Sequence, residues 1–341
     1  MTADAFRRLA EIRAGIERRL TRLSFAGSPR DLRDACRYVI RSGGKRIRGA
    51  MVVLSCQAVG GSAARAVNAA AAVELLHNFT LVHDDIMDNA AVRRGRPTVH
   101  KRWNVNHALL VGDVLLGTAY EVLLESAGSA GDLLAGILTR GLADVCDGQA
   151  MDLAFERRAD VTVPEYFRMI EMKTAKLIAT AAELGGVIGG ATRSQGDALR
   201  RFALRLGRAF QLQDDLLDVV ADPRHFGKST GGDILEGKRT YLLLTAAARA
   251  RGNDRTVIRQ VLSRTGPGSG WKSVRGHVTG SGRTLVAEVK SIYERLGVLD
   301  DARRLVRRST TEALAGLDRL PPSPARETLR ALAEDLVTRA S

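Results

Sequence analysis

The 341-residue sequence contains few aromatic residues and few cysteines. Aromatic residues make up 4 % of the chain, which disfavours a β-rich fold and a nucleic-acid reader that stacks bases on aromatic rings. The three cysteines, Cys36, Cys56 and Cys146, are far apart and form no CxxC pair. This pattern argues against a disulfide framework or a structural zinc site, and it predicts a reducing, cytoplasmic compartment.

Long apolar runs are also missing. A membrane-spanning helix needs about 20 apolar residues in succession. The nearest candidate, residues 177–191, is shorter and contains Glu183. The arginine-rich N-terminus contains Asp4, Glu11 and Glu17 and lacks the apolar core of a signal peptide. We therefore expect a soluble protein with no transmembrane segment.

Lysine is scarce among the positive charges. Lysine and arginine together number 52 against 38 acidic residues, a net charge of +14, yet only eight of the 52 are lysines. Taken alone, this charge suggests an acidic partner, and a basic nucleic-acid-binding protein is one alternative that a salt-dependent gel shift would test. Against it, the chain has no recognisable binding motif, and its acidic clusters would repel phosphate without a metal.

The apolar residues that are present recur at three- and four-residue intervals over most of the chain, which is a helical pattern. No sustained alternation of apolar and polar residues and no βαβ pattern occur. The pattern predicts an all-α bundle, a single domain over residues 1–341 without an internal boundary. Two glycine-rich segments interrupt it: we expect a mobile loop at residues 222–240 and a flexible insertion at 264–283.

Two aspartate clusters occur, each after a long apolar segment. HDDIMD and QDDLLD contain Asp84, Asp85 and Asp88, and Asp214, Asp215 and Asp218. The outer aspartates of each cluster are four residues apart, so on a helix they share one face, where like charges repel. One such cluster could be a solvated helix end or cap. Two of them predict a divalent-cation site, and carboxylate oxygens favour Mg²⁺.

Cationic residues accompany both clusters. They are Lys45 and Arg48 in a turn ahead of a helix, Arg93 and Arg94 after the first cluster, Lys173 next to Thr174, and Lys228 and Lys238 around glycine-rich sequence. An ammonium group suits phosphate as a compact charge, and arginine offers a bidentate fork. The combination predicts a site for a phosphorylated, Mg²⁺-bound substrate on a helical scaffold.

These segments resemble the motifs of a known family. GGKRIRG, LVHDDIMDNAAVRRGRPTVH, EMKTAKL, FQLQDDLLD and GKSTGGDILEGKRTYLL, from about residue 40 to 245, match in order and spacing the trans-isoprenyl diphosphate synthases, or polyprenyl synthetases. The likeness is to the short-chain geranylgeranyl and farnesyl diphosphate synthases. It implies a helical bundle of the isoprenoid synthase type around a deep central cavity, usually a homodimer. It also implies head-to-tail condensation of an allylic diphosphate with isopentenyl diphosphate.

The resemblance implies a role for each matching residue. Three Mg²⁺ ions would be bound by Asp84, Asp88 and Asp214, with Asp85, Asp215 and Asp218 in support and Asp218 a further candidate ligand. The allylic diphosphate would contact Arg93, Lys173, Lys228 and Lys238, and isopentenyl diphosphate would contact Lys45, Arg48, His77 and Arg94. Thr174 and Gln211 would lie near the developing carbocation. Gly49 stands where relatives commonly have proline.

Product length follows from the same resemblance. In the family, a bulky residue five positions before the first aspartate stops the growing chain early. That residue is Phe79, about 7–8 Å along the helix from Asp84. Thr80 beside it is small, and Leu76 lies a turn deeper with Leu75. We expect a C20 product first and a C15 product second, against the simpler interpretation that Phe79 only packs in the core.

A class I terpene cyclase is the nearest alternative because it shares the fold and the first aspartate motif. A cyclase normally carries an Asn/Ser/Glu metal motif in place of the second cluster and does not need the Lys45 and Arg48 site. It would release a hydrocarbon from one prenyl diphosphate without isopentenyl diphosphate. A catalytically inactive partner subunit is disfavoured because both aspartate motifs are complete.

Overall fold

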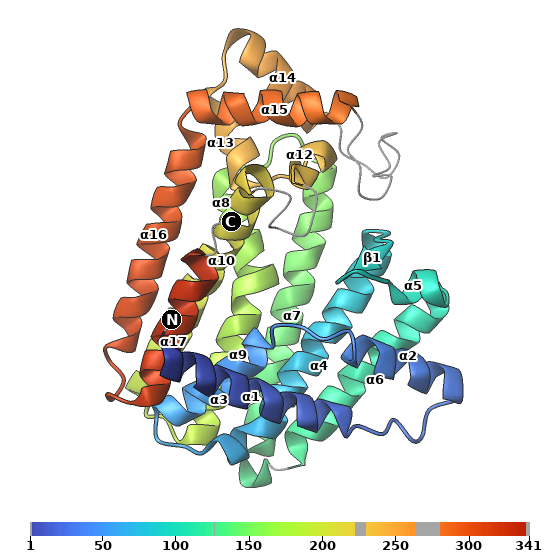
Figure 1. Cartoon of the computed structure of the whole chain (residues 1–341), viewed down its shortest axis with the longest axis vertical. Coiled ribbons are helices and arrows are strands. Elements are labelled where there is room, and N and C mark those ends of the chain that lie inside the picture. Colours follow the sequence, from blue (N-terminus) through green and yellow to red (C-terminus); the bar gives the residue numbers. More distant parts are fainter. Residues whose placement is uncertain (1, 126, 222–229, 264–279, 339–341) are drawn as a thin grey trace. The chain divides into compact units, whose positions relative to one another are not determined.

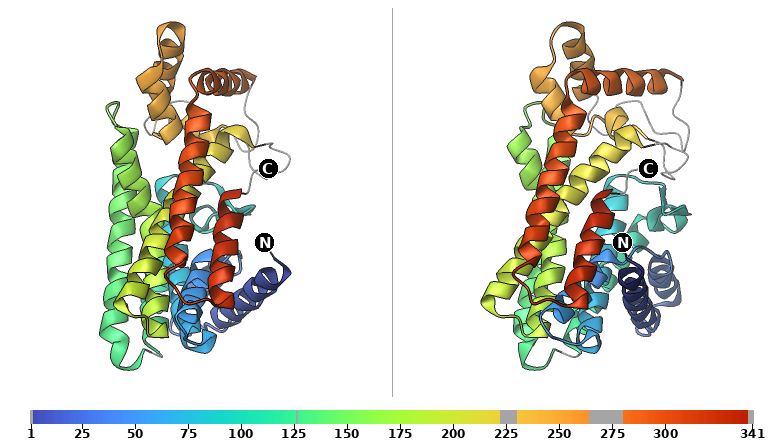
Figure 2. Two further views of the ribbon diagram at one scale, coloured as in Figure 1. Left: turned by 90° about the vertical axis from the view of Figure 1, so that its left-hand side faces the viewer. Right: turned by 60° about the vertical axis from the view of Figure 1, so that its left-hand side comes forward.

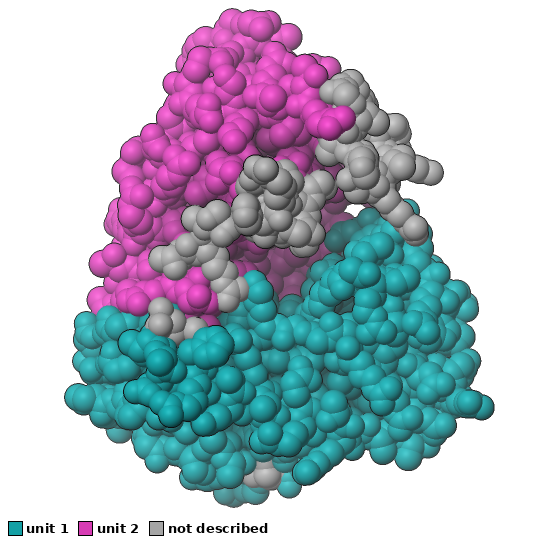
Figure 3. Space-filling view, viewed as in Figure 1, with its two compact units in different colours: residues 1–142, 178–200, 317–331 teal, residues 143–177, 201–316, 332–341 magenta. Residues whose placement is uncertain are grey.

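The computed structural model describes residues 2–125, 127–221, 230–263 and 280–338 (Figure 1). Within these ranges the regular secondary structure is helical except for one antiparallel pair of two-residue strands, β1 (Val92–Arg93) and β2 (Arg96–Pro97). The predicted all-α class is confirmed. Contacts group the chain into two compact units (Figure 3). Unit 1 comprises residues 1–142, 178–200 and 317–331, and unit 2 comprises residues 143–177, 201–316 and 332–341.

Unit 1 is built around a helix that is buried on nearly all sides. Its elements are α1 (Ala3–Thr21), α2 (Arg30–Ile40), α3 (Ile47–Ala58), α4 (Ala63–Met87), the strands, α5 (Val99–Arg102), α6 (Val105–Leu124), η1 (Gly128–Ala130) and the first part of α7 (Gly131–Glu156). Helix α4 packs against α3 and α6. Every residue from Ala69 to Leu76 is buried, and the four alanines that open this stretch let neighbouring helices approach closely. The first aspartate cluster ends this helix.

Unit 2 contains the second aspartate cluster. Its elements are α8 (Val163–Ile170), the π-helix η2 (Glu171–Ala175), most of α10 (Arg193–Val220), α12 (Gly232–Glu236), α13 (Tyr241–Arg249), α14 (Gly252–Leu262), α15 (Gly280–Arg295) and α16 (Val298–Leu317). Helices α9 (Lys176–Gly189) and α17 (Pro324–Thr338), like α7 and α10, contribute residues to both units. Figure 2 shows α16 alongside α10, where Arg205 and Glu312 approach to 3.3 Å.

Local sequence explains where α8 begins. The Thr162 hydroxyl accepts the Glu165 backbone N–H, and the Glu165 carboxylate accepts the Thr162 N–H, which is a complete capping box. Pro164 occupies the first turn, where its missing N–H has no intrahelical partner to lose. The helix that leads to Lys173 and Thr174 therefore starts at a fixed residue.

The two glycine-rich segments fall partly outside the described residues. Of the predicted loop, residues 222–229 are not described, but residues 232–236 form the short helix α12. The expectation of loop throughout 222–240 is therefore wrong for this part. Gly231 precedes α12 with φ of +85°, a conformation that favours glycine. Of the predicted insertion, residues 264–279 lie outside the described residues, and residues 280–283 begin α15.

One helix has the length and apolar composition of a membrane-spanning segment. Among the residues that the structure describes, α6 alone is long and apolar enough to cross a membrane by length and composition, and 39 % of its most apolar stretch is buried. Residues 177–191, the most apolar run noted in the sequence, contribute instead to α9. Helix α6 contains Asp113 and Glu121, and it packs along α4.

Close helix packing in unit 1 yields the first prediction. Gly185 of α9 lies against α3, where an added Cβ would overlap the carbonyl oxygen of Val52. We expect Gly185→Ala to lower the free energy of unfolding by about 1–3 kcal/mol because a well-packed interior does not accept an extra methyl group. Gly196→Ala is the matched control, since nothing lies within 4 Å of a Cβ there. Urea unfolding should show the control unchanged or slightly stabilised; equal losses for both variants would contradict the packing explanation.

Candidate active site

The loop before α3 is held by a buried arginine. Arg46 has φ of +49° and is 2 % exposed. Its Nε donates to Glu17 Oε1 at 2.7 Å and its Nη2 donates to the Ile40 carbonyl at 3.0 Å, while Nη1 lies 3.5 Å from Glu74 Oε2. The other Glu74 oxygen accepts the Gly49 N–H at 2.8 Å. The segment that contains Lys45 and Arg48 is thus tied to α1 and α4.

Three cationic or basic side chains gather beside this loop. Arg48 Nη1 donates to His77 Nε2 at 3.0 Å. Burial, reinforced by Arg48 and Arg94, holds the pKa of His77 well below its usual value, so the ring is the neutral acceptor. Within the described residues the Arg48 Nε is buried and has no hydrogen-bond partner. A buried, unsatisfied guanidinium N–H is costly, and an anionic ligand would satisfy it.

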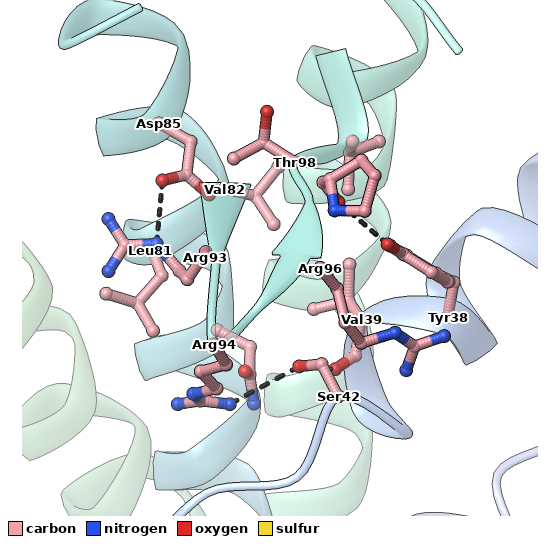
Figure 4. Close-up of a pocket in the computed structure, with 13 residues that line it drawn as sticks. Tyr38, Val39, Ser42, Leu81, Val82, Asp85, Arg93, Arg94, Arg96 and Thr98 are labelled. Atoms are coloured by element: carbon pink, nitrogen blue, oxygen red, sulfur yellow. Dashed lines mark hydrogen bonds and ion pairs between the residues drawn. The ribbon is translucent and has the colours of Figure 1, made fainter. Parts of the chain in front are cut away.

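The turn between the strands places two further arginines in unit 1. Figure 4 shows Arg93 directed toward Asp85 and Arg94 directed toward Ser42, around a cavity of about 40 Å³. Arg93 Nε lies 2.6 Å from Asp85 Oδ1, and Arg94 donates to the Gly43 carbonyl oxygen. Lys45 is exposed in the loop before α3, which also contains Gly43. The four residues predicted for isopentenyl diphosphate, Lys45, Arg48, His77 and Arg94, all belong to this unit.

The first aspartate cluster lies in the last turn of α4. Asp84 is half-buried, Asp88 caps the helix and is exposed, and Asp85 is buried against Arg93. Burial raises the pKa of Asp85, and Arg93 opposes this shift. Asp85 is therefore occupied by an ion pair, and Asp84 and Asp88 are the more exposed carboxylates.

The residues predicted to set product length lie along the same helix. Leu76 is fully buried, and Phe79 and Thr80 are each 9 % exposed. The Thr80 hydroxyl donates to the His77 carbonyl at 2.8 Å, so it is satisfied within the helix. Phe79 packs edge-on against the His83 ring, with centroids 4.7 Å apart.

In unit 2, Lys173 and Thr174 lie in the π-helix η2. Such single-turn bulges are rare and often occur at functional sites. Glycines of two helices flank it: a Cβ at Gly148 of α7 would overlap the Lys173 backbone, and one at Gly207 of α10 would lie 2.5 Å from Ala175 Cα. The bulge is thus enclosed by close backbone contacts. Lys173 Nζ pairs with Asp152 Oδ2 at 2.5 Å.

A hydrogen-bonded chain continues from this bulge to the second cluster. The Thr174 hydroxyl donates to Gln211 Oε1 at 3.0 Å, and Gln211 Nε2 donates to Asp215 Oδ1 at 2.9 Å. The Tyr166 hydroxyl donates to the other Asp215 oxygen at 2.6 Å. Both oxygens of Asp215 are therefore occupied, and the chain aligns Thr174 with Gln211.

Asp233 joins Asp218 and Lys238 in a further polar group of unit 2. Asp218 Oδ2 accepts the Asp233 N–H at 3.0 Å, and Lys238 Nζ lies 3.4 Å from Asp233 Oδ1. Burial first, and then repulsion by Asp233, raise the pKa values of Asp215 and Asp218. Asp214 is exposed on α10, and Lys228 lies outside the described residues. The unit holds carboxylates that repel one another.

The family model for polyprenyl synthetase matches residues 29–270, which is most of the chain. The chain belongs to the polyprenyl synthetase family. It is 39 % identical to the short chain isoprenyl diphosphate synthase of Methanothermobacter thermautotrophicus over 92 % of this chain and 91 % of that protein. It is 34 % identical to the geranylgeranyl diphosphate synthase of Methanosarcina mazei over 91 % of this chain and 90 % of that protein.

A solved structure agrees. The geranylgeranyl pyrophosphate synthetase from Pyrococcus horikoshii superposes with a TM-score of 0.89 at 34 % identity, over 98 % of both chains. The predicted resemblance is confirmed, and so is the isoprenoid synthase type of all-α fold. As a polyprenyl synthetase, the protein is an enzyme, a trans-prenyltransferase.

The oxygen ligands of this polyprenyl synthetase fit Mg²⁺. Within the described residues no three acidic, histidine or cysteine side chains converge as a ready metal cage. Mg²⁺ is commonly held by one or two carboxylates together with substrate phosphates and water, so a preformed cage is not required. Burial first, and then repulsion by Asp233, raise the pKa values of Asp215 and Asp218, and a bound cation would favour the charged form of both.

Several residues of the candidate site were missed from the sequence. Asp152 pairs with Lys173, Asp233 pairs with Lys238, and Tyr166 holds Asp215. Asp233 lies inside the GKSTGGDILEGKRT segment, so the family motif could have identified it as a candidate site residue. Asp152 was detectable only as an acid within a largely apolar helix. Tyr166 gave no signal, because its partner is 49 positions away.

The neutral His77 gives a pH-dependent prediction. The unfolded chain binds a proton at His77 as pH falls through about 6.5, whereas the folded chain does not, because its pKa is lower. Stability is therefore lost as pH falls below about 6.5. Between pH 7.5 and 5.5 we expect the wild type to lose about 1 kcal/mol more unfolding free energy than His77→Gln, which cannot titrate. Urea unfolding at both pH values measures this, and identical pH slopes would disprove the assignment.

Proposed function

We propose that this trans-prenyltransferase condenses an allylic diphosphate with isopentenyl diphosphate, head to tail, to a short-chain trans-prenyl diphosphate. Geranylgeranyl diphosphate (C20) is the expected main product and farnesyl diphosphate (C15) the next. The observation that carries the proposal is the pair of cations Arg48 and Arg94 with the neutral His77 between α3 and α4, and the unsatisfied Arg48 Nε. An enzyme with one diphosphate substrate needs no such second anion site. The names of the similar proteins support the same chemistry.

Isopentenyl diphosphate is assigned to Lys45, Arg48, His77 and Arg94. Arg48 offers the free Nε, and Arg94 offers a fork held by the Gly43 carbonyl. Neutral His77 accepts from Arg48 and so orients the guanidinium. Lys45 adds a compact exposed charge at the same loop. Together these groups would bind the diphosphate of isopentenyl diphosphate and so hold the double bond of the isopentenyl group in a fixed orientation.

The allylic diphosphate is assigned to the cations that now pair with aspartates. Arg93, Lys173 and Lys238 are held by Asp85, Asp152 and Asp233, and Lys228 is proposed with them. Three Mg²⁺ ions bound by Asp84, Asp88, Asp214 and Asp218 would supply charge neutralisation that makes diphosphate a better leaving group. Lys238 keeps its charge, since Asp233 holds its pKa well above the ordinary value.

Thr174 and Gln211 are proposed to face the developing positive charge. The Thr174 hydroxyl uses its hydrogen to donate to Gln211, which leaves its oxygen lone pairs available to a cation. Apolar helices exclude water, which would otherwise capture the cation. As in the family, the departing diphosphate is proposed to accept the final proton, so a dedicated base is not needed.

The cyclase alternative is not favoured. The second cluster retains three aspartates, and the cationic group of unit 1 is complete. Nucleic-acid binding gains no support from a polyprenyl synthetase match.

Assembly as a homodimer is proposed from α6. Leu109 and Leu110 are 43 % and 51 % exposed on this helix, whose other face is buried against α4. A second copy covering these leucines would remove them from water. We propose accordingly that α6 does not span a membrane and that the enzyme is cytoplasmic. Because one family model runs through both compact units, we also propose that they form a single domain.

The test is a prenyltransferase assay. Purified enzyme is incubated with Mg²⁺, isopentenyl diphosphate and each of the C5, C10 and C15 allylic diphosphates, and products are sized by chromatography. Asp84→Ala and Asp214→Ala should each lower turnover by at least about 100-fold, because charge stabilisation of the leaving group is lost. Asp197→Ala on α10, an exposed aspartate far from the cluster, is the control. Full activity of either cluster variant, or hydrocarbon release without isopentenyl diphosphate, would refute the proposal.

Product length has its own test. Phe79→Ala removes the bulky side chain from the proposed path, so we expect products longer than those of the wild type. Val82→Ala is the matched control, since Val82 is also buried on α4 but lines the cavity of Figure 4. Chromatographic profiles report a ratio of products, which partial unfolding does not change. An unaltered profile for Phe79→Ala would show that Phe79 serves only core packing.

A further inference from the structure

His83 connects Phe79 to the neighbouring helix. Phe79 and His83 are one turn apart on α4, with ring centroids 4.7 Å apart and planes inclined at 64°. His83 Nε2–H donates to the Leu109 carbonyl of α6 at 3.2 Å. The imidazole is therefore fixed at one end by α6 and presents its ring to Phe79. Edge-on aromatic pairs of this geometry are mutually attractive.

Gly112 provides the space that His83 occupies. It is a buried glycine in the middle of α6, and a Cβ there would overlap the His83 imidazole. Glycine in a helix interior is less stable than alanine. The contact with His83 explains why glycine is nevertheless found at position 112. Gly117, five residues later on the same helix, has nothing within 4 Å of an added Cβ. The close approach is specific to Gly112.

We propose that His83 is a positioning residue for Phe79, and that the His83–Gly112 pair sets product length together with Phe79. The inference rests on the proposed function, in which Phe79 blocks the growing prenyl chain. A phenyl ring blocks a path only while neighbours prevent it from turning aside, and His83 is the neighbour whose own position is fixed by a hydrogen bond to another helix.

A role for His83 as a ligand of the phosphate or metal site fits less well. Although His83 adjoins Asp84 in sequence, its Nε2–H is engaged with the Leu109 carbonyl and its ring lies against Gly112. Its contacts are thus with α6 and Phe79. This placement predicts an effect on which product forms rather than on whether the reaction proceeds.

The experiment compares product profiles of Gly112→Ala and Gly117→Ala. The new methyl group at position 112 must displace His83 and so release Phe79. We expect the ratio of products longer than C20 to C20 to rise at least about threefold in Gly112→Ala and to stay unchanged in Gly117→Ala. His83→Ala, which removes atoms and cannot clash, should shift the ratio in the same direction. Circular dichroism checks that each variant is folded.

A double variant separates positioning from general disturbance. In a Phe79→Ala background there is no ring left to position, so Gly112→Ala should add no further lengthening. An additional shift in that background, or an unchanged profile for folded His83→Ala, would overturn the inference. If Phe79→Ala lengthens the products while Gly112→Ala and His83→Ala do not, the proposed function stands and this inference alone fails. Absence of any prenyl diphosphate from the wild type would instead overturn the function itself.

Discussion

The ion pairs of the buried Arg46 guanidinium are the interaction on which the loop of Lys45 and Arg48 in unit 1 depends. It lies between the carboxylates of Glu17 and Glu74, and Glu74 also accepts a backbone N–H at the start of α3. A charge removed from water is tolerated only when it is paired and hydrogen-bonded, and loss of one partner costs about 3–5 kcal/mol. The left-handed backbone at Arg46 is held by the same contacts. Because Arg46 is fixed, the backbone that carries Arg48 two positions later is fixed as well.

Charge pairing also prepares the cations assigned to the allylic diphosphate. Arg93, Lys173 and Lys238 each have an aspartate partner before any ligand is considered. The aspartate gives its cation a defined direction, but it also competes with the incoming phosphate for that cation. A cation that neutralises the acids would weaken that competition. Affinity for substrate and affinity for metal should therefore be thermodynamically coupled in this enzyme.

Much of the architecture could be predicted from local sequence. The three- and four-residue apolar period reports helices directly, and aspartates four residues apart on such a helix share a face without further information. The partners of the cations could not be predicted in the same way. Asp152 and Lys173 are 21 positions apart, and the buried Arg46 and Glu74 are 28 apart. Such pairs depend on tertiary packing, which periodicity does not encode. The helix α12 was missed because two glycines at its start outweighed its short apolar content.

The π-helix η2 has a consequence for how this part of the chain tolerates change. A π turn accommodates one residue more than an α turn, so the segment behaves as a one-residue insertion in an otherwise regular helix. Side chains after the bulge are rotated by roughly 100° relative to an uninterrupted helix. Deleting one residue from Glu171–Ala175 would leave a sequence fully able to be helical while turning Lys173 or Thr174 to another face. In this segment, the helix content and the direction of the Lys173 and Thr174 side chains are independent properties, and selection can act on one without the other.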